Sequence, residues 1–365
     1  MATVTKTIKS GGDYTSPSAW EEDLDDSSIY SSGDTAVGEC SGEHELTSEL
    51  IMNGGGTVGL TQTRLTAPSA DRHDGTAGSG TRFTFDMAYS RILTLGYAVA
   101  AVQRTCEWIE FDFEDTVRGG NEWIYIDVGT TADGSTAHLG TFSHNLLHSL
   151  DAGSNIVRVL WAKSKYNAVH NNILYDVTSS TGTWVRGIGS YNVLSYTASN
   201  TVYNVGCTGS GTANGMWQSS GTYNVVEDNI SVGTSGTSSS DFNTTAVSGS
   251  VNLSSDSSAP GASAVHGEAA ADIFVSTTGG SEDLHLKSGA AAIGAGYDIG
   301  TSYSWSIHGG VTVGSSTFGT SVNYDIDNYN REDADAWDIG ADQYVAASTG
   351  GGTAPIVLAT TMAGL

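Results

Sequence analysis

The chain has 365 residues, of which 47 are glycine and only 4 are proline, and its hydrophobic share is 38%. Its 14 lysines and arginines stand against 40 aspartates and glutamates, which gives a net charge of −26. A surface of this charge repels DNA, RNA and anionic membranes, so we expect no nucleic-acid partner and no membrane insertion. The scarcity of long helix-forming runs argues against an all-helical fold and favours an all-β fold.

Residues 1–34 predict a strand followed by a short helix. Ser16 is a capping residue, Pro17 suits the first helical position, and Trp20 and Leu24 fall on one face of the helix. We expect this helix to cover the open end of a repeating fold, because an end repeat must hide an otherwise bare core and strand edge.

The segment from 35 to 271 predicts short strands separated by turns rich in Gly, Ser and Thr. The stretch Cys106–Glu114 alternates strictly, with Ile109, Phe111 and Phe113 on one side. The other side is predicted to carry Trp108, Glu110, Asp112 and Glu114. The stretch 121–128 alternates in the same way, with Trp123, Tyr125 and Asp127 on its polar side.

Four asparagines, Asn145, Asn172, Asn200 and Asn229, recur at intervals of 27, 28 and 29 residues, each before a short apolar or β-branched run. A period in this range is typical of a solenoid. In a parallel β-helix each coil stacks on the last at about 4.8 Å, so equivalent asparagines can donate to and accept from one another. The sequence therefore predicts a stacked asparagine ladder.

The closing region, 272–345, contains Asp283-Leu-His-Leu-Lys-Ser-Gly-Ala-Ala-Ala-Ile-Gly-Ala-Gly and, further on, Asp325-Ile-Asp-Asn-Tyr-Asn-Arg and Asp338-Ile-Gly-Ala-Asp-Gln-Tyr. These two segments resemble the end of many right-handed parallel β-helix proteins. Gly11-Gly-Asp-Tyr-Thr-Ser resembles the start of the same proteins. The group includes polysaccharide lyases, glycoside hydrolases, surface adhesins and phage tailspike-like proteins. The resemblance implies a right-handed parallel β-helix with an N-terminal cap and a C-terminal clasp.

We interpret the closing region as a structural clasp in which Arg331 binds a carboxylate bidentately and Asp338 takes part. A calcium site is the alternative, with Asp325, Asp327 and Asp333 as its ligands. No other cofactor is expected. Three widely spaced cysteines without a CxxC motif give neither a disulfide framework nor a zinc site.

If the chain cleaves glycans, Asp112, Glu114 and Asp127 are the candidate catalytic residues. Same-face carboxylates on one strand are about 7 Å apart, which suits an inverting glycosidase. Trp108, Trp123 and Tyr125 are the candidate glycan-binding residues. The competing interpretation is an acidic solvent-exposed face.

Two further enzymatic patterns are weaker. A lyase would need a basic residue to take a proton, for which Arg158, Lys163, Lys165 and Arg186 are the candidates. The histidines form no HExxH motif. His144 and His148, four residues apart, are expected to share a strand face without a third partner and to be turn residues.

Three function classes remain. The first is a structural or adhesive virion protein, such as a phage spike, fibre or capsid-decorating protein, that acts as a homo-oligomer with other virion proteins and binds cell-surface glycans. A trimer is favoured, and the apolar tail 346–365 is its expected assembly contact. The N-terminus lacks an apolar signal region, which favours synthesis in a host cytoplasm. The second class is a glycan depolymerase and the third a secreted bacterial surface adhesin.

Overall fold

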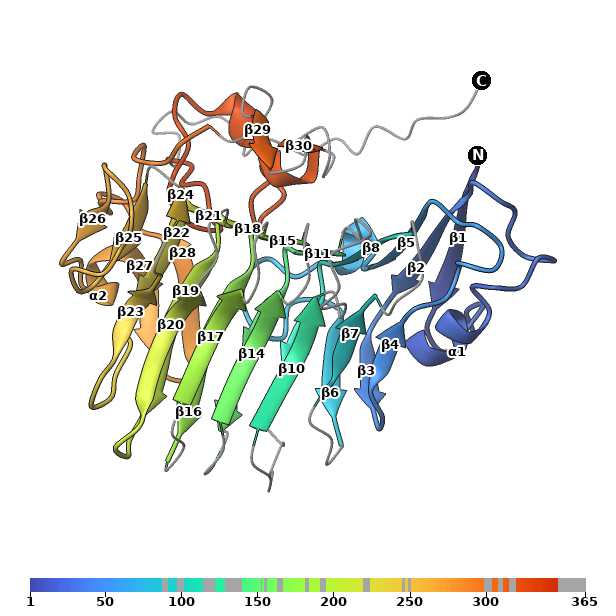
Figure 1. Cartoon of the computed structure of the whole chain (residues 1–365), viewed down its shortest axis with the longest axis horizontal. Helices are drawn as coiled ribbons and strands as arrows, with labels where there is room; N and C mark the ends of the chain where they lie inside the picture. The colour runs from blue at the N-terminus through green and yellow to red at the C-terminus, as the bar shows by residue number, and fades with distance from the viewer. Residues whose placement is uncertain are drawn as a thin grey trace, which may run out of the picture.

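The computed structural model describes residues 1–86, 91–96, 102–113, 122–128, 140–151, 153, 156–162, 167–180, 184–190, 195–218, 224–244, 247–248, 251–298, 304–307, 311–314 and 320–346. Within these ranges the protein is nearly all β, and most strands belong to three parallel sheets. Successive repeats of the chain add one strand to each sheet, so the stack grows steadily away from the N-terminus (Figure 1). The predicted all-β, solenoid-like stacking is confirmed.

The first sheet has nine strands: β1 (Thr3–Ile8), β2 (Thr35–Cys40), β5 (Gln62–Thr66), β8 (Gln103–Glu107), β11 (Gly140–Ser143), β15 (Asn167–His170), β18 (Ser195–Ala198), β21 (Asn224–Glu227) and β24 (Val247–Ser248). The second sheet has ten: β3 (Glu43–Leu46), β6 (Arg82–Phe85), β9 (Glu110–Asp112), β12 (Leu146–His148), β13 (Leu150–Asp151), β16 (Ile173–Ser179), β19 (Thr201–Cys207), β22 (Asn229–Val232), β25 (Asn252–Ser254) and β26 (Val265–His266). The third sheet has seven: β4 (Leu50–Met52), β7 (Leu93–Leu95), β10 (Glu122–Val128), β14 (Ile156–Ala162), β17 (Trp184–Ser190), β20 (Thr212–Gln218) and β23 (Ser240–Asn243).

Two antiparallel hairpins and a few short helices complete the described structure. The hairpins are β27 (Phe274–Thr278) with β28 (Ser281–Leu286), and β29 (Ser304–Ile307) with β30 (Val311–Gly314). The helices are α1 (Pro17–Glu22), α2 (Ala270–Ile273) and the 3₁₀ turns η1 (Ser69–Asp71), η2 (Thr320–Asn323) and η3 (Arg331–Asp333). No helix of the described residues is both long and apolar enough to cross a membrane.

The predicted asparagine ladder is present and buried along its length. Each amide oxygen accepts from the backbone N–H and from the Nδ2 of the preceding asparagine, at 2.9–3.2 Å. Asn252 adds a fifth rung that the sequence prediction missed, because it follows Asn229 after 23 residues. At the other end Ile109 takes the equivalent position, and its N–H donates to Asn145.

At every ladder position except Asn252, the preceding residue makes the sharp corner between the first and second sheets. Trp108, His144, Asn171, Ser199 and Asp228 all have a left-handed backbone, with φ between 51° and 61°. This conformation is uncommon for residues other than glycine, asparagine and aspartate, and it is sustained by the surrounding ladder. The ladder asparagines themselves do not have this conformation.

The N-terminal helix is present as α1. The Ser16 hydroxyl accepts from the Ala19 N–H at 3.2 Å, and Pro17 occupies the first turn, as predicted. Trp20 and Leu24 are fully buried, and the Trp20 indole donates to the Tyr30 hydroxyl at 3.1 Å. The helix therefore inserts its apolar side into the first repeats.

The closing region forms a clasp, although not by the predicted contact. The buried Arg331 guanidinium donates to the backbone carbonyls of Asp338 and Gly340, at 3.0 and 2.7 Å, and forms no ion pair with a carboxylate of the described residues. The predicted bidentate Arg–carboxylate contact is wrong. Asp338 instead accepts from the backbone N–H groups of Gly294 and Tyr344, both at 2.6 Å.

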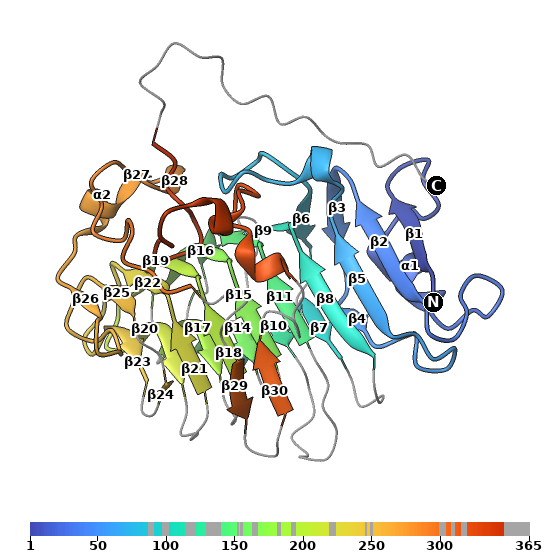
Figure 2. The same cartoon turned by 90° about the horizontal axis from the view of Figure 1, so that it is seen from above.

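The clasp also returns to the middle of the stack (Figure 2). The Tyr324 carbonyl accepts from the corner residues His144 and Asn171, at 2.8 and 2.7 Å. Asn328 accepts from Arg72, which lies in the loop between β5 and β6. The clasp therefore fastens repeats in the middle of the chain.

The pH dependence of stability follows from His285, which is held between Asp283 and Asp327 in the clasp. Burial lowers the pKa of His285, but the hydrogen bonds and charges of Asp327, Asp342 and Asp283 outweigh it and raise the pKa from 6.5 to about 10. The stabilisation is therefore fully present below pH 6.5 and is lost as the pH rises towards 10. We measure the free energy of unfolding in urea at pH 6, 8 and 10. We expect it to fall less steeply with rising pH in His285→Gln than in the wild type.

The control for this prediction is His266→Gln, which removes an exposed histidine of β26. Its pH curve should follow that of the wild type. Parallel curves for His285→Gln and the wild type would contradict the prediction.

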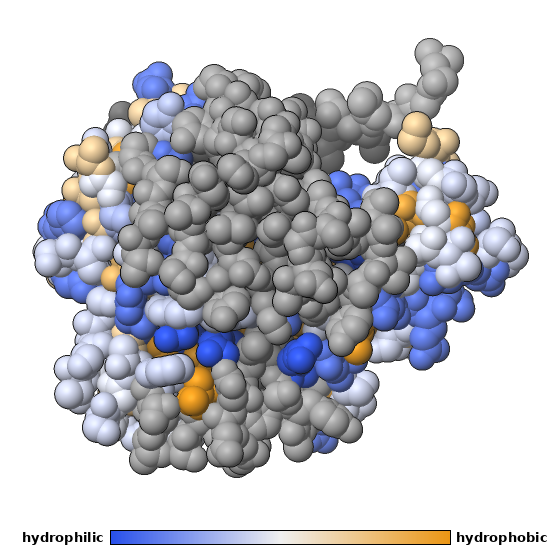
Figure 3. All heavy atoms as spheres, viewed as in Figure 1, coloured by the Kyte–Doolittle hydropathy of each residue, from blue (hydrophilic) through white to orange (hydrophobic). Residues whose placement is uncertain are grey.

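Large apolar side chains are rarely exposed among the described residues. Those that are exposed, Met1, Trp184, Val275, Tyr297 and Val345, are scattered along the chain. Seen from the third sheet, the coloured surface is mostly polar with small apolar spots (Figure 3). The predicted assembly contact, 346–365, lies outside the described residues apart from Ala346.

Candidate functional site

Three adjoining pockets form a groove along the outer face of the second sheet. Their volumes are about 500, 520 and 360 Å³. The first two share Arg82 and Asp112, and the last two share Ser149, Asp176 and Glu282, so the pockets are continuous. The groove extends from β3 to β19, between the loop of residues 67–80 and the β27–β28 hairpin.

The groove is strongly acidic. Its carboxylates are Glu43, Glu45, Asp86, Glu110, Asp112, Asp151, Asp176, Glu282 and Asp283. Arg82 is the single lysine or arginine among its described lining residues. Burial and the adjacent Asp176 carboxylate raise the pKa of Glu282. Such a lining repels polyanions and offers many acceptors to hydroxyl groups.

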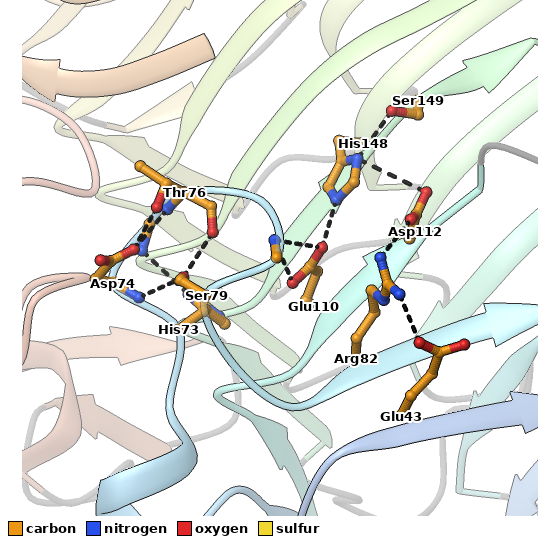
Figure 4. Close-up of polar contacts among 12 residues, drawn as sticks. Glu43, His73, Asp74, Thr76, Ser79, Arg82, Glu110, Asp112, His148 and Ser149 are labelled. Atoms are coloured by element: carbon orange, nitrogen blue, oxygen red, sulfur yellow. Dashed lines mark hydrogen bonds and ion pairs between the residues drawn. The ribbon is translucent and has the colours of Figure 1, made fainter. Parts of the chain in front are cut away.

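At the centre of the groove, Glu110, Asp112 and His148 form a cluster (Figure 4). Alternation along β9 buries Phe111 in the core and turns Glu110 and Asp112 outward. The parallel pairing of β9 with β12 then sets His148 directly beside Asp112. One side-chain oxygen or nitrogen from each member lies within 4.8 Å of the others.

Glu110 is fully buried because the 67–80 loop covers it. The Gly78 N–H donates to both of its carboxylate oxygens, at 3.0 and 2.9 Å. Asp74 shapes this loop by accepting from the Thr76 N–H at 3.1 Å, in an Asx turn. Glu110 is therefore fixed in position.

His148 is bonded on both sides of its ring. Nε2 lies 3.0 Å from Glu110 Oε1, and Nδ1 lies 2.9 Å from Ser149 Oγ. Since a carboxylate only accepts, Nε2 carries the proton, and Nδ1 accepts from the Ser149 hydroxyl. The ring also stacks on Tyr175, with centroids 5.3 Å apart. Both its tautomer and its orientation are thereby set.

Asp112 links this cluster to the first pocket. Its Oδ2 lies 3.4 Å from Arg82 Nη1, and Arg82 also pairs with Glu43. Asp112 Oδ1 lies 3.9 Å from His148 Nδ1. Asp112 thus stands between a guanidinium and an imidazole, as Figure 4 shows.

Of the three predicted catalytic residues, only Asp112 is placed in the groove. Asp127 lies on β10 of the third sheet, where it is buried and pairs with Arg91 at 3.8 Å. Asp112 and Asp127 therefore do not converge on one groove, because the chain changes sheet between β9 and β10. Glu114 lies outside the described residues.

The predicted glycan-binding face is also divided. Trp108 was expected beside Glu110 and Asp112, but its left-handed corner separates β8 from β9. It is 3% exposed, with Arg72 over its ring at 4.5 Å and His144 stacked on it at 4.4 Å, so little of the ring is open to a sugar. Trp123 and Tyr125 belong to β10, and their side chains lie outside the described part of the structure.

Neither of the two described lyase candidates lines the groove. Arg158 and Arg186 lie on the third sheet, over Trp161 and Trp217. Lys163 and Lys165 lie outside the described residues.

The prediction that His144 and His148 share a face without a third partner is wrong. His144 is a corner residue bonded to Tyr324, whereas His148 ends β12 and contacts Glu110. Sequence reasoning missed His148 and Ser149 as site residues. The ladder intervals of 27 to 29 residues count back from His148 to positions 119–121, so they do not give its pairing with Asp112.

The alternative calcium ligands do not gather at one point. Asp325 accepts from the backbone N–H groups of Asp327, Tyr329 and Gln343, so its oxygens hold the chain together. Asp333 is exposed on η3. Asp327 lies instead with His285 and Asp342. The predicted triplet of Asp325, Asp327 and Asp333 is therefore not a cluster.

Compared with models of known protein families, with curated proteins and with solved structures, the chain matches none of them. The similarity of its closing region to that of β-helix proteins thus stays a prediction.

Proposed function

We propose that the chain is a right-handed parallel β-helix that acts as a glycan-binding adhesive protein of a virus particle, with a neutral polysaccharide held along the groove of the second sheet. The groove carries this proposal. Its three joined pockets extend across the second sheet from β3 to β19. This extent suits an extended polymer better than a single small molecule. The virion setting and a homotrimeric assembly rest on the sequence resemblance and on the apolar tail 346–365.

The groove lining favours a neutral glycan. Carboxylates accept hydrogen bonds from sugar hydroxyls, and the partly exposed Tyr203 lines the third pocket beside Asn204. Polyuronates carry one negative charge per residue and would be repelled by this lining. The preferred ligand class is therefore an uncharged polysaccharide.

Affinity electrophoresis against neutral and anionic polysaccharides tests this proposal. The blocking variant is Thr178→Trp, which places an indole in the third pocket, and the control is Thr5→Trp on β1, outside the groove. The affinity for a neutral glycan, measured from the retardation, should fall at least about tenfold in Thr178→Trp. It should stay unchanged in Thr5→Trp. Equal retardation of both variants, or preference for a polyuronate, would refute groove binding.

Glycan processing is the second candidate function, and the Glu110–His148–Asp112 cluster favours it. The closest cluster oxygens of Glu110 and Asp112 lie within 4.8 Å, below the ~6.5–9.5 Å spacing of inverting glycosidases. The predicted inverting mechanism is thus not supported by this pair. Glu110 is also buried against Gly78 and His148, so it is suited to hold the imidazole rather than to touch a sugar.

A further inference from the structure

We propose that Ser149 is a nucleophile, activated by His148, that removes acyl groups from an O-acylated glycan bound in the groove. This proposal rests on the groove binding a glycan and adds the reaction and the substrate class: carboxylic esters of sugar hydroxyls. The geometry that carries it is a continuous chain of hydrogen bonds from Ser149 through His148 to the buried Glu110.

The hydrogen-bond chain has one consistent direction. The Ser149 hydroxyl donates to Nδ1 of His148 at 2.9 Å, and Nε2–H of His148 donates to Glu110 at 3.0 Å. A nucleophile bonded to a base, and a base oriented by a third group, is the recurring arrangement of hydroxyl activation. Here the two imidazole nitrogens exchange the positions they occupy in the Ser-His-Asp enzymes, which does not alter the proton transfer.

The position of Ser149 suits attack on a bound ligand. It is partly exposed and lines both the second and the third pocket. Its left-handed backbone, with φ of 63°, interrupts the strand between β12 and β13 and is uncommon for serine. Ser281 lines the second pocket as well, but its hydroxyl donates to the Gly280 carbonyl and contacts no described histidine.

The charges around His148 suit its role as a base. When the imidazole takes a proton it becomes a cation, with Glu110 at 3.0 Å and Asp112 at 3.9 Å. Both carboxylates stabilise that cation, and the contact with Arg82 holds Asp112 in place. Glu110 is a positioning residue, because it reaches the substrate only through the imidazole.

The reaction balances with water as the second reactant. Ser149 Oγ attacks the ester carbonyl and its proton passes to His148 Nδ1. The C–O bond to the sugar breaks, and His148 returns the proton to the departing sugar oxygen. Water then attacks the acyl-serine, with His148 again taking and returning a proton, and releases the carboxylic acid and free Ser149. The acidic lining repels the carboxylate product, which favours its departure.

The experiment uses the full chain and two readouts that need no glycan: labelling by a fluorophosphonate probe and hydrolysis of p-nitrophenyl acetate. We expect Ser149→Ala to abolish labelling and to reduce hydrolysis to the buffer rate. His148→Gln should slow hydrolysis at least about 10²-fold. Ser149→Gly, which tolerates the left-handed backbone, keeps the test valid if the alanine variant misfolds.

Matched controls are His266→Gln and Ser239→Ala, which removes a hydroxyl that donates to the Gly236 carbonyl outside the groove. His266 also lies beside a serine, 3.3 Å from Ser254, but it is exposed and in β26. Both controls should keep wild-type labelling and hydrolysis. The proposal would be overturned if the probe left the wild type unlabelled. It would also be overturned if the Ser149→Gly variant were labelled as strongly as the wild type.

Failure of groove binding gives a different pattern. If the glycan is not held in the groove, affinity electrophoresis shows no retardation while Ser149 still reacts with the probe and with p-nitrophenyl acetate. If Ser149 is not a nucleophile, retardation persists while both chemical readouts are absent. Release of acetate from an O-acetylated neutral glycan tests both proposals at once, because it requires the glycan to bind in the groove and Ser149 to act as the nucleophile.

Discussion

Asn200→Ala is expected to lower the free energy of unfolding by about 4 kcal/mol or more. Asn200 is fully buried in the ladder. Its Oδ1 accepts from the backbone N–H and the Nδ2 of Asn172, and its Nδ2 donates to Val169, Ala198 and Asn229. An alanine leaves these buried groups unpaired, and each costs about 1–3 kcal/mol when no water replaces the lost partner.

Urea unfolding followed by circular dichroism measures this effect, with Asn243→Ala as the matched control. Asn243 is an exposed asparagine of β23, so its removal should change the unfolding free energy by no more than about 0.5 kcal/mol. Asn200→Asp should be as harmful as the alanine variant, because it keeps the acceptor, loses the donor and buries a charge. Equal midpoints for Asn200→Ala and Asn243→Ala would contradict a stabilising ladder.

The sequence predicted the ladder because a turn asparagine that bonds to its own copies must recur once per coil. The prediction failed where the coil changed. Asn252 follows a shorter coil, and the coil that contains Trp108 has Ile109 in the ladder position. With no asparagine to mark the corner, the alternation over Cys106–Glu114 looked like one strand, although the chain turns at Trp108.

The candidate site was harder to predict, because its parts come from distant segments. Asp112 was recognised from strand alternation alone. The pairing of His148 with Glu110 spans 38 residues and depends on the register of β9 against β12. The cover over Glu110 comes from Gly78, and the far wall of the groove from the β27–β28 hairpin. Local patterns contain no information on such contacts.

Arg331→Met is expected to open the clasp and to lower the free energy of unfolding by about 3 kcal/mol. Methionine fills part of the space but leaves the carbonyls of Asp338 and Gly340 without their donors. Burial raises the pKa of Asp325 to about 7, and it raises the pKa of Asp338 and Asp342 as well. The charge of Arg331 lowers all three, so its removal destabilises their ionised forms further.

Hydrogen exchange locates the opening predicted for Arg331→Met. The Gly294 and Tyr344 amides donate to Asp338 within the clasp, whereas the Asn172 amide donates to Asn200 within the ladder. We expect the two clasp amides to lose protection and the ladder amide to keep it, since the sheets stack without the clasp. Lys287→Met, at a partly exposed position of the same region, should leave all three unchanged. Simultaneous loss of protection at all three amides in Arg331→Met would show instead that the clasp and the stack unfold as one unit.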